Sequence, residues 1–340
     1  MARPGPARRD TLAGLTQVAA AGLIWGTIPL VLRASDGSPL VKVFFRVAIA
    51  ALVLLAVLAA TGKLSDLRRL DRRTMLGLAG LGVILAVNWL LFIYALDMTK
   101  VAVAELLGYT GPVFVAVLAP FVTGESFDRR VVLPLALALA GIVVILAPQG
   151  LQVSSPRELL GAGLAFLSAL TYAMLLLRSK RLMADVSGST LMFFELAVAA
   201  LLLLPFAIWM YATGQGPSGW VSYGALITLG VVHTGLAGIL FIGGLGRVRT
   251  DHAAVLSYTE PASAVLFAAA FLGEPLTLAT IAGGAMVIAG GALVARIAPL
   301  EVGFGQEAAD IAPAGPETVP TDPSGDAPQA TPSDAGSGVG

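Results

Sequence analysis

Ten apolar runs, each near or above the roughly 18 residues that a helix needs to cross a bilayer, recur along the whole chain. They cover residues 12–33, 39–61, 75–97, 101–122, 130–147, 158–177, 190–211, 221–242, 252–272 and 277–296. The composition agrees, because 57% of the residues are hydrophobic and only 12% are charged, whereas a soluble domain is about half apolar and a quarter charged. The sequence therefore predicts an all-α polytopic membrane protein with ten transmembrane helices.

The distribution of basic residues predicts the orientation of these helices. With the N-terminus in the cytoplasm, sixteen Lys and Arg residues lie on the cytoplasmic side and four on the external side, and Arg46 lies within a span. Such an excess is what the positive-inside rule requires. We therefore expect a multi-pass protein of the plasma or inner membrane with both termini in the cytoplasm. The first run is expected to remain as an uncleaved span, because it has spanning length and no A-x-A-like cleavage site closes it.

One segment of the chain occurs twice. The segment LGYTGPVFVAVLAPFVTGE begins at Leu107, and LSYTEPASAVLFAAAFLGE begins at Leu256, at a constant shift of 149. The same shift places Phe44-Phe45-Arg46 over Phe193-Phe194-Glu195, and a shift of 147 places Trp25 over Tyr172 and Arg33 over Lys180. Each half contains five spans, an odd number, so the second copy enters the membrane upside down relative to the first. We predict two inverted-topology five-helix repeats that face each other across a central cavity.

The repeats divide the chain into five parts. We expect a cytoplasmic N-terminal arm at 1–11, the first repeat at 12–147, an external linker at 148–157, the second repeat at 158–296 and a cytoplasmic tail at 297–340. The tail is acidic, rich in Pro, Gly and Ala, and without Lys or Arg. Since it has too few apolar side chains to offset the entropy of ordering, it is expected to be disordered.

These features together resemble the drug/metabolite transporter superfamily, and its EamA-type branch most closely. The motifs are Trp25-Gly26 in the first span, Pro112 followed by Gly124-Glu125 in the fourth, and Glu260-Pro261 followed by Gly273-Glu274 in the ninth. The resemblance runs from Leu12 to Arg296. It implies ten helices in two inverted halves, and a transporter that typically exports amino acids, other small metabolites, sugar phosphates or drugs. The motifs do not specify the cargo.

Pro112 and Pro261 are expected to interrupt their helices, because proline lacks an amide hydrogen and clashes with the preceding turn. Freed carbonyl groups at membrane depth are tolerated only beside protein or a wet cavity. Interrupted helices at matching positions of two repeats indicate a central binding site. The alternative is that both prolines only kink their helices for packing.

Glu260 places a carboxylate near the middle of the ninth span. A charge at the centre of a transmembrane helix costs about 2.5–3.5 kcal/mol on insertion scales, so the side chain is expected to face an interior cavity or a partner. There it would bind a substrate ammonium group or take up a proton during transport. Alternatively, it stays neutral and forms a hydrogen bond with backbone that Pro261 has freed. Its counterpart in the first repeat, Gly111, carries no charge.

Three further charged residues are candidates for gates. Arg46 lies one or two turns into the second span from the external side, and its counterpart Glu195 lies at a similar depth from the cytoplasmic side. Glu105 lies about one turn into the fourth span. Ion pairs among such residues would close the two ends alternately. The alternative for Arg46 is a side chain that extends to the membrane interface.

The two histidines are interpreted differently. His233, in the eighth span, is a candidate proton relay because imidazole titrates near neutrality; the alternative is a hydrogen-bonded packing residue. His252 adjoins Asp251 and two arginines at a cytoplasmic helix start, and it is expected to be solvated.

Polar and aromatic residues of the spans are candidates for lining a small-molecule site, because such sites are mostly apolar and aromatic with a few polar groups. The candidates are Asn88, Tyr109, Tyr258, Trp25 and Tyr172. The glycines of GGAMVIAGG in the tenth span are instead expected to let helices pack closely.

The sequence favours a secondary transporter over an enzyme. It has no HExxH, no GxSxG with triad partners, no P-loop and no clustered metal ligands, and it contains two histidines and no cysteine. We therefore expect no catalytic activity, no cofactor and no metal, and the net charge of zero suggests no nucleic-acid partner. The predicted function is export of a small metabolite, such as an amino acid or a related compound, by alternating access, either proton-linked or facilitative. The alternative is a non-transporting scaffold or sensor, or a lipid-flipping protein.

Overall fold

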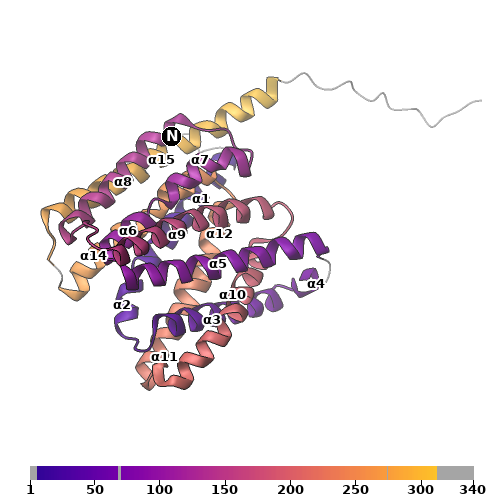
Figure 1. Ribbon diagram of the computed structural model, residues 1–340. Coiled ribbons are helices and arrows are strands. Elements are labelled where there is room, and N and C mark those ends of the chain that lie inside the picture. The colour runs from indigo at the N-terminus through magenta and orange to yellow at the C-terminus, as the bar shows by residue number, and fades with distance from the viewer. Residues whose placement is uncertain (1–5, 68–69, 274, 312–340) are drawn as a thin grey trace, which may run out of the picture. The chain divides into compact units, whose positions relative to one another are not determined.

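The computed structural model describes residues 6–67, 70–273 and 275–311, and within them every regular element is a helix (Figure 1). Ten of the described helical segments are long and apolar enough to cross a membrane. Each overlaps one of the ten predicted runs, in the same order. The predicted fold class, an all-α polytopic membrane protein with ten transmembrane helices, is confirmed.

Six of the described spans consist of one α-helix. They are α3 (Pro39–Ala60), α5 (Arg72–Met98), α8 (Val132–Leu146), α9 (Pro156–Leu182), α10 (Gly188–Met210) and α15 (Leu278–Ile311). Short 3-10 turns extend one of them, α8, at both ends, and a π turn extends another, α10. The other four are interrupted. They are formed by α1 (Pro6–Trp25) with α2 (Ile28–Arg33), α6 (Val101–Gly108) with α7 (Gly111–Val122), α11 (Gly219–Thr228) with the π-helical segment η4 (Leu229–Leu236) and α12 (Ala237–Leu245), and α13 (Thr250–Ser257) with α14 (Thr259–Leu272). The short α4 (Leu64–Leu67) follows α3.

The end of α15 differs from the prediction for the tail. The chain divides into two units at Gly303, and the described residues of the second unit, up to Ile311, are helical. Residues 297–311 are therefore helical in this structure, where disorder was expected. The physical reason is that extending an existing helix adds one hydrogen bond per residue without a new nucleus. Residues 312–340 lie outside the described residues, and so does Glu274.

Polar side chains mark where four of the spans begin. Ser38, Asp71, Ser155 and Ser187 each accept a hydrogen bond from a backbone N–H in the first turn of α3, α5, α9 and α10. α3 and α9 also begin with proline, whose missing N–H would have no partner at that position. Each cap satisfies an amide that the helix itself cannot. These residues therefore fix where each helix begins, near the first residue of its apolar run.

Eight spans form a closed ring in which each helix packs against two neighbours. The order around the ring is fourth, sixth, third, seventh, second, eighth, first and ninth span, and the ninth packs against the fourth through α13 and α7. Figure 1 shows part of this order, with α9, α5, α10 and α3 side by side. Every ring neighbour of a span belongs to the other repeat. The repeats are interleaved, so the expectation of two half-bundles facing each other is wrong: each helix packs its apolar faces on helices of the other copy.

The fifth and tenth spans pack against this ring. α8 contacts α6 and α13, and glycines bring α8 close to α15. A Cβ atom on Gly283 would lie 2.4 Å from the carbonyl oxygen of Gly141, and one on Gly290 would lie 2.8 Å from that of Pro134. A Cβ atom on Gly284 would meet nothing within 4 Å. Two glycines of GGAMVIAGG therefore serve the close helix packing that the sequence predicts.

Candidate functional site

Three charged side chains from three spans meet inside the ring. The carboxylate of Glu260, in the first turn of α14, interacts electrostatically with Arg46 of α3 and with Glu105 of α6. The second and ninth spans are not neighbours in the ring, so Arg46 and Glu260 interact across its interior, at more than ion-pair distance. All three side chains are half-buried. Neither carboxylate has a hydrogen-bond partner among the described residues, so both keep their capacity to accept hydrogen bonds.

Arg46 is held by two other spans. Its Nε–H donates a hydrogen bond of 2.5 Å to the Thr234 hydroxyl, which in turn donates to the Leu229 carbonyl oxygen at 3.0 Å. Its guanidinium carbon lies 5.1 Å from the ring centroid of Trp89 in α5, a cation–π contact that contributes about 0.5–2 kcal/mol. These partners keep Arg46 inside the bundle, and the alternative of a side chain that extends to the membrane interface is wrong.

His233 connects the eighth span to the interrupted first span. Its backbone carbonyl oxygen accepts a 2.7 Å hydrogen bond from the Trp25 indole N–H, and its Nε2 lies 2.8 Å from the Thr27 hydroxyl, between α1 and α2. Its Nδ1 lies 3.3 Å from the Thr228 carbonyl oxygen. The side chain is only 2% exposed, and both ring nitrogens have partners. These contacts are the ones expected of a hydrogen-bonded packing residue, the alternative to a proton relay.

The π-helical segment η4 explains why His233 and Thr234 both reach the first repeat. A π turn inserts an extra residue into a helix and is frequent at functional sites. Here consecutive residues contact different spans, His233 the first and Thr234 the second. Gly230 allows the close approach, because a Cβ atom there would lie 2.5 Å from Cβ of Ile49. Sequence reasoning missed this segment, and its glycines are the only local signal.

The three predicted lining tyrosines, Tyr109, Tyr172 and Tyr258, gather where the fourth, sixth and ninth spans meet. The Tyr258 hydroxyl donates a 2.6 Å hydrogen bond to the Tyr109 carbonyl oxygen, between α6 and α7. The Tyr172 hydroxyl donates to that of Ser257 at 3.4 Å. Tyr109 and Tyr172 interact electrostatically with Glu260, whereas Tyr258 is fully buried. Tyr109 and Tyr172 therefore border the charged group, and Tyr258 holds the two helix breaks together.

Both prolines directly follow these breaks. Pro112 is the second residue of α7 and Pro261 the third of α14, where a missing N–H leaves no hydrogen bond unmade. Each span therefore ends one helix and starts another. Gly111 stands where the second repeat has Glu260, and a Cβ atom on Gly111 would lie 2.8 Å from the Tyr172 ring. This contact explains why the first repeat has no side chain at that position.

Two predicted site residues lie away from the charged group. Asn88 is buried and donates to the Ser168 carbonyl oxygen at 2.6 Å and to the Thr171 hydroxyl at 3.0 Å, so it joins the third span to the sixth. Glu195 lies where α10 packs on α5, and a Cβ atom on Gly82 would lie 2.8 Å from its carbonyl oxygen. Neither residue is among the groups that interact electrostatically with Glu260.

A second polar group lies at the predicted cytoplasmic end, and sequence reasoning missed it. The Glu125 carboxylate accepts hydrogen bonds from the Thr250 backbone N–H at 3.0 Å and from the Thr250 hydroxyl at 2.8 Å. Since Thr250 is the first residue of α13, Glu125 caps that helix. Arg249 donates to the Ser126 carbonyl oxygen at 2.6 Å and pairs with Asp251 at 2.8 Å. We call these five residues the span 4–9 cluster.

His252 and Lys180 lie next to this cluster. The expectation that His252 is solvated is wrong, because its side chain is 1% exposed and its Nε2 lies 3.9 Å from Asp251 Oδ1. The Lys180 ammonium donates to the carbonyl oxygens of Leu245 and Val248 at the end of α12. The Gly-Glu motif that closes the fourth span was the signal for the cluster. Within the part of the chain that the structure describes, no three His, Asp or Glu side chains gather in a way that could hold a metal ion.

Comparison with known proteins gives the same architecture. A model of the EamA-like transporter family matches the chain twice, over residues 12–147 and 159–296. A solved crystal structure superposes with a TM-score of 0.72 at 24% sequence identity, covering 85% of this chain and 99% of that one. At this sequence identity, the likeness shows a shared fold and nothing further.

Several relatives match most of the chain. An uncharacterized transporter of Archaeoglobus fulgidus is 31% identical over 277 residues, which are 82% of this chain and 94% of the relative. Protein RarD of Salmonella typhimurium is 27% identical over 78% of this chain and 88% of its own length. The pseudopaline exporter CntI of Pseudomonas aeruginosa is 27% identical over 76% of this chain and 87% of its own length.

Proposed function

Because this chain belongs to the EamA-like transporter family, we propose that it is a secondary transporter that exports a small zwitterionic metabolite, such as an amino acid or a related compound. Membrane transport follows from the family. The substrate class, the direction, the cell membrane as its location and alternating access as its mechanism are our proposal.

One observation carries the substrate class: Arg46, Glu105 and Glu260 bring charges of both signs together inside the ring. A guanidinium group binds a carboxylate through charge-assisted hydrogen bonds, and a carboxylate binds an ammonium group in the same way. A zwitterion of amino-acid size has both partners. A sugar phosphate would instead bring further negative charge next to two carboxylates. Trp89 and Tyr109 add aromatic surface beside the charges.

Export and proton linkage have separate support. One relative is named as an exporter, of pseudopaline, which favours the outward direction for this chain. A carboxylate that binds an ammonium group can bind a proton in its place. Glu260, which lacks a hydrogen-bond partner among the described residues, is the group that we assign to this exchange.

Transport by the purified protein in liposomes tests the proposal. We expect counterflow of radiolabelled amino acids, and none of sugar phosphates. Arg46→Gln and Glu105→Gln should each lower the flux about tenfold or more, since losing a hydrogen bond to a charged group costs about 1.5–3 kcal/mol. Arg157→Gln is the control and should stay within about twofold, because that guanidinium is exposed and pairs with Asp97 outside the charged group.

Two results would contradict the proposal. Movement of lipid alone, or of nothing, would favour the lipid-flipping or scaffold alternative. Amino-acid flux that Arg46→Gln and Glu105→Gln leave unchanged would show that the charged group is not the binding site.

A further inference from the structure

The fourth and ninth spans break the pseudo-symmetry of the chain. The shift of 149 makes α6 equivalent to α13, and α7 equivalent to α14. α7 packs against α13 at the predicted cytoplasmic end. The equivalent pair at the predicted external end, α14 and α6, shares no comparable packing among the described residues; α14 packs on α1 and α2, and α6 on α9. The two spans are therefore joined at one end of the ring and parted at the other.

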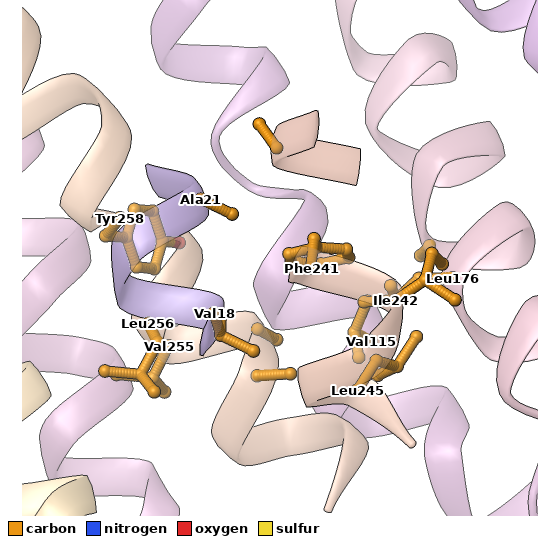
Figure 2. Packing of buried hydrophobic residues seen from close by; sticks show 14 of the residues in the cluster. Val18, Ala21, Val115, Leu176, Phe241, Ile242, Leu245, Val255, Leu256 and Tyr258 are labelled. Atoms are coloured by element: carbon orange, nitrogen blue, oxygen red, sulfur yellow. The ribbon is translucent and has the colours of Figure 1, made fainter. Parts of the chain in front are cut away.

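Apolar side chains pack against one another at the joined end. Figure 2 shows Val115 of α7 next to Ile242 and Leu245 of α12, and all three are buried. The same buried cluster includes side chains from the first, sixth and ninth spans, namely Val18, Leu176 and Val255. All of these residues lie in the halves of their spans that face the predicted cytoplasm. These side chains pack the fourth, sixth, eighth and ninth spans together at this end.

The span 4–9 cluster crosses the same junction. Glu125 and Ser126 follow α7, and Arg249 and Thr250 precede and begin α13. The two hydrogen bonds of Glu125 and the bond from Arg249 to Ser126 thus fasten the fourth span to the ninth. The cluster lies at the ends of the spans, where water can replace hydrogen bonds that break. Its opening is therefore reversible, which would not hold for the same bonds in the middle of the membrane.

We propose that Glu125, Arg249 and Thr250 form a latch that holds the predicted cytoplasmic end closed, and that each transport cycle requires this latch to release. The structure is then the state open to the outside. In the opposite state, α7 and α13 move apart, while α6 and α14 pack against each other. The proposal rests on the proposed transport function for its role in the cycle, but the release itself is a change of conformation that is measured without a substrate.

Reversible cross-linking tests whether the latch must open. The chain has no cysteine, so the double variant Glu125→Cys/Thr250→Cys carries only the introduced pair. We expect a thiol cross-linker to lower its amino-acid flux at least tenfold, and a reductant to restore the flux. The matched control is Asp97→Cys/Arg157→Cys, which also joins the two repeats. Because α5 and α9 pack extensively on each other, its cross-link should leave the flux within twofold. Undiminished flux in the cross-linked Glu125→Cys/Thr250→Cys variant would overturn the latch.

Labelling tests the release without any substrate. Ala254 is fully buried in α13, so an Ala254→Cys variant should react slowly with a membrane-impermeant maleimide applied to inside-out vesicles. Adding Glu125→Ala should raise this rate at least fivefold, whereas adding Glu158→Gln, at the opposite end of the sixth span, should not. An unchanged rate would contradict the latch. A raised rate in a protein that moves no amino acid would keep the latch and reject the proposed function, so the two failures are distinguishable.

Discussion

At the scale of single residues, the environment of Arg46 decides what the charged group can bind. A guanidinium inside a bilayer needs partners, and here Thr234 and Trp89 supply two from different spans. Across the ring, the charge of Arg46 interacts electrostatically with Glu260. The orientation of the guanidinium therefore depends on a threonine of the second repeat, and the carboxylate recognition that we propose depends on that orientation.

Thr234→Val removes the hydroxyl that accepts the Arg46 Nε–H. We expect a folded protein whose apparent affinity for the substrate falls about tenfold, because a misplaced guanidinium loses about 1.5–3 kcal/mol of charged hydrogen bonding. Thr228→Val is the matched control, since the Thr228 hydroxyl binds only within its own span, to the Gly224 carbonyl oxygen. Concentration-dependent counterflow measures both. Equal affinities in the two variants would show that Thr234 does not position Arg46.

Glu260→Gln keeps the shape of the side chain and removes its charge and its proton. We expect that a pH gradient no longer drives accumulation of the substrate, while exchange of substrate across the membrane remains measurable. Flux assays in liposomes, with and without an imposed pH gradient, compare accumulation of the substrate with its exchange. Gradient-driven accumulation at the level of the unaltered protein would remove Glu260 from proton coupling and leave a facilitative transporter.

At the scale of elements, the interruptions of the spans bring the site together. The fourth and ninth spans break near their middle, the first breaks just before the six-residue α2, and the eighth contains a π-helical segment. Contacts between breaks supply the partners that the freed backbone groups need, as in the bonds from Trp25 to the His233 carbonyl and from Tyr258 to the Tyr109 carbonyl. In these two bonds, a side chain of one repeat satisfies a backbone carbonyl group of the other.

Close packing of α8 on α15 depends on glycine at the crossing. Gly283→Ala would place a Cβ atom 2.4 Å from the Gly141 carbonyl oxygen, so the helices must move apart. We expect this overpacking to cost about 1–3 kcal/mol and to lower the thermal midpoint in detergent by several degrees. Gly284→Ala is the control, because its Cβ atom meets nothing within 4 Å. A midpoint unaffected by Gly283→Ala would mean that the two helices do not pack at this distance.

At the scale of the whole molecule, the two repeats have a common core. Each span in the ring has its two main neighbours in the other repeat, and a loop contact also joins the repeats: Asp36 accepts hydrogen bonds from the Ser218 backbone N–H and hydroxyl. These bonds hold the pKa of Asp36 well below its ordinary value. Because the repeats interleave, neither can rock against the other as a rigid body. The alternating access that we propose therefore requires a change at particular junctions of the ring, and the junction between the fourth and ninth spans is already asymmetric.

The interleaved ring predicts that neither repeat folds alone. Expressed separately, the two halves of a chain cut within 148–157 should be degraded or aggregate, because each exposes the faces that the other covers. Co-expression of both halves should restore a complex with substrate flux. Size-exclusion chromatography and flux assays measure the outcome. A monodisperse single half with a cooperative thermal transition would contradict the interleaved core.

Hydropathy and the internal repeat were sufficient to predict the ten spans and the two copies. Both are properties of consecutive residues, since a helix that crosses lipid needs a continuous apolar run, so they can be read from the sequence. They also singled out Glu260, Arg46 and Glu105, since a charge in an apolar run is conspicuous whatever its neighbours. The same reasoning gave Arg46 and Glu195 as counterparts at opposite ends of the spans, but it did not predict the hydrogen bond from Arg46 to Thr234 or the electrostatic interaction of Arg46 with Glu260.

The sequence by itself thus determined which segments cross the membrane and which residues are unusual there. Only the tertiary structure decided the order of helices around the ring, the burial of His252 and the contact of Glu125 with Thr250. The physical reason is that helices inside a bilayer are equally apolar on most faces. Their neighbours are chosen by shape, by glycines that permit close approach and by single hydrogen bonds between residues far apart in the chain.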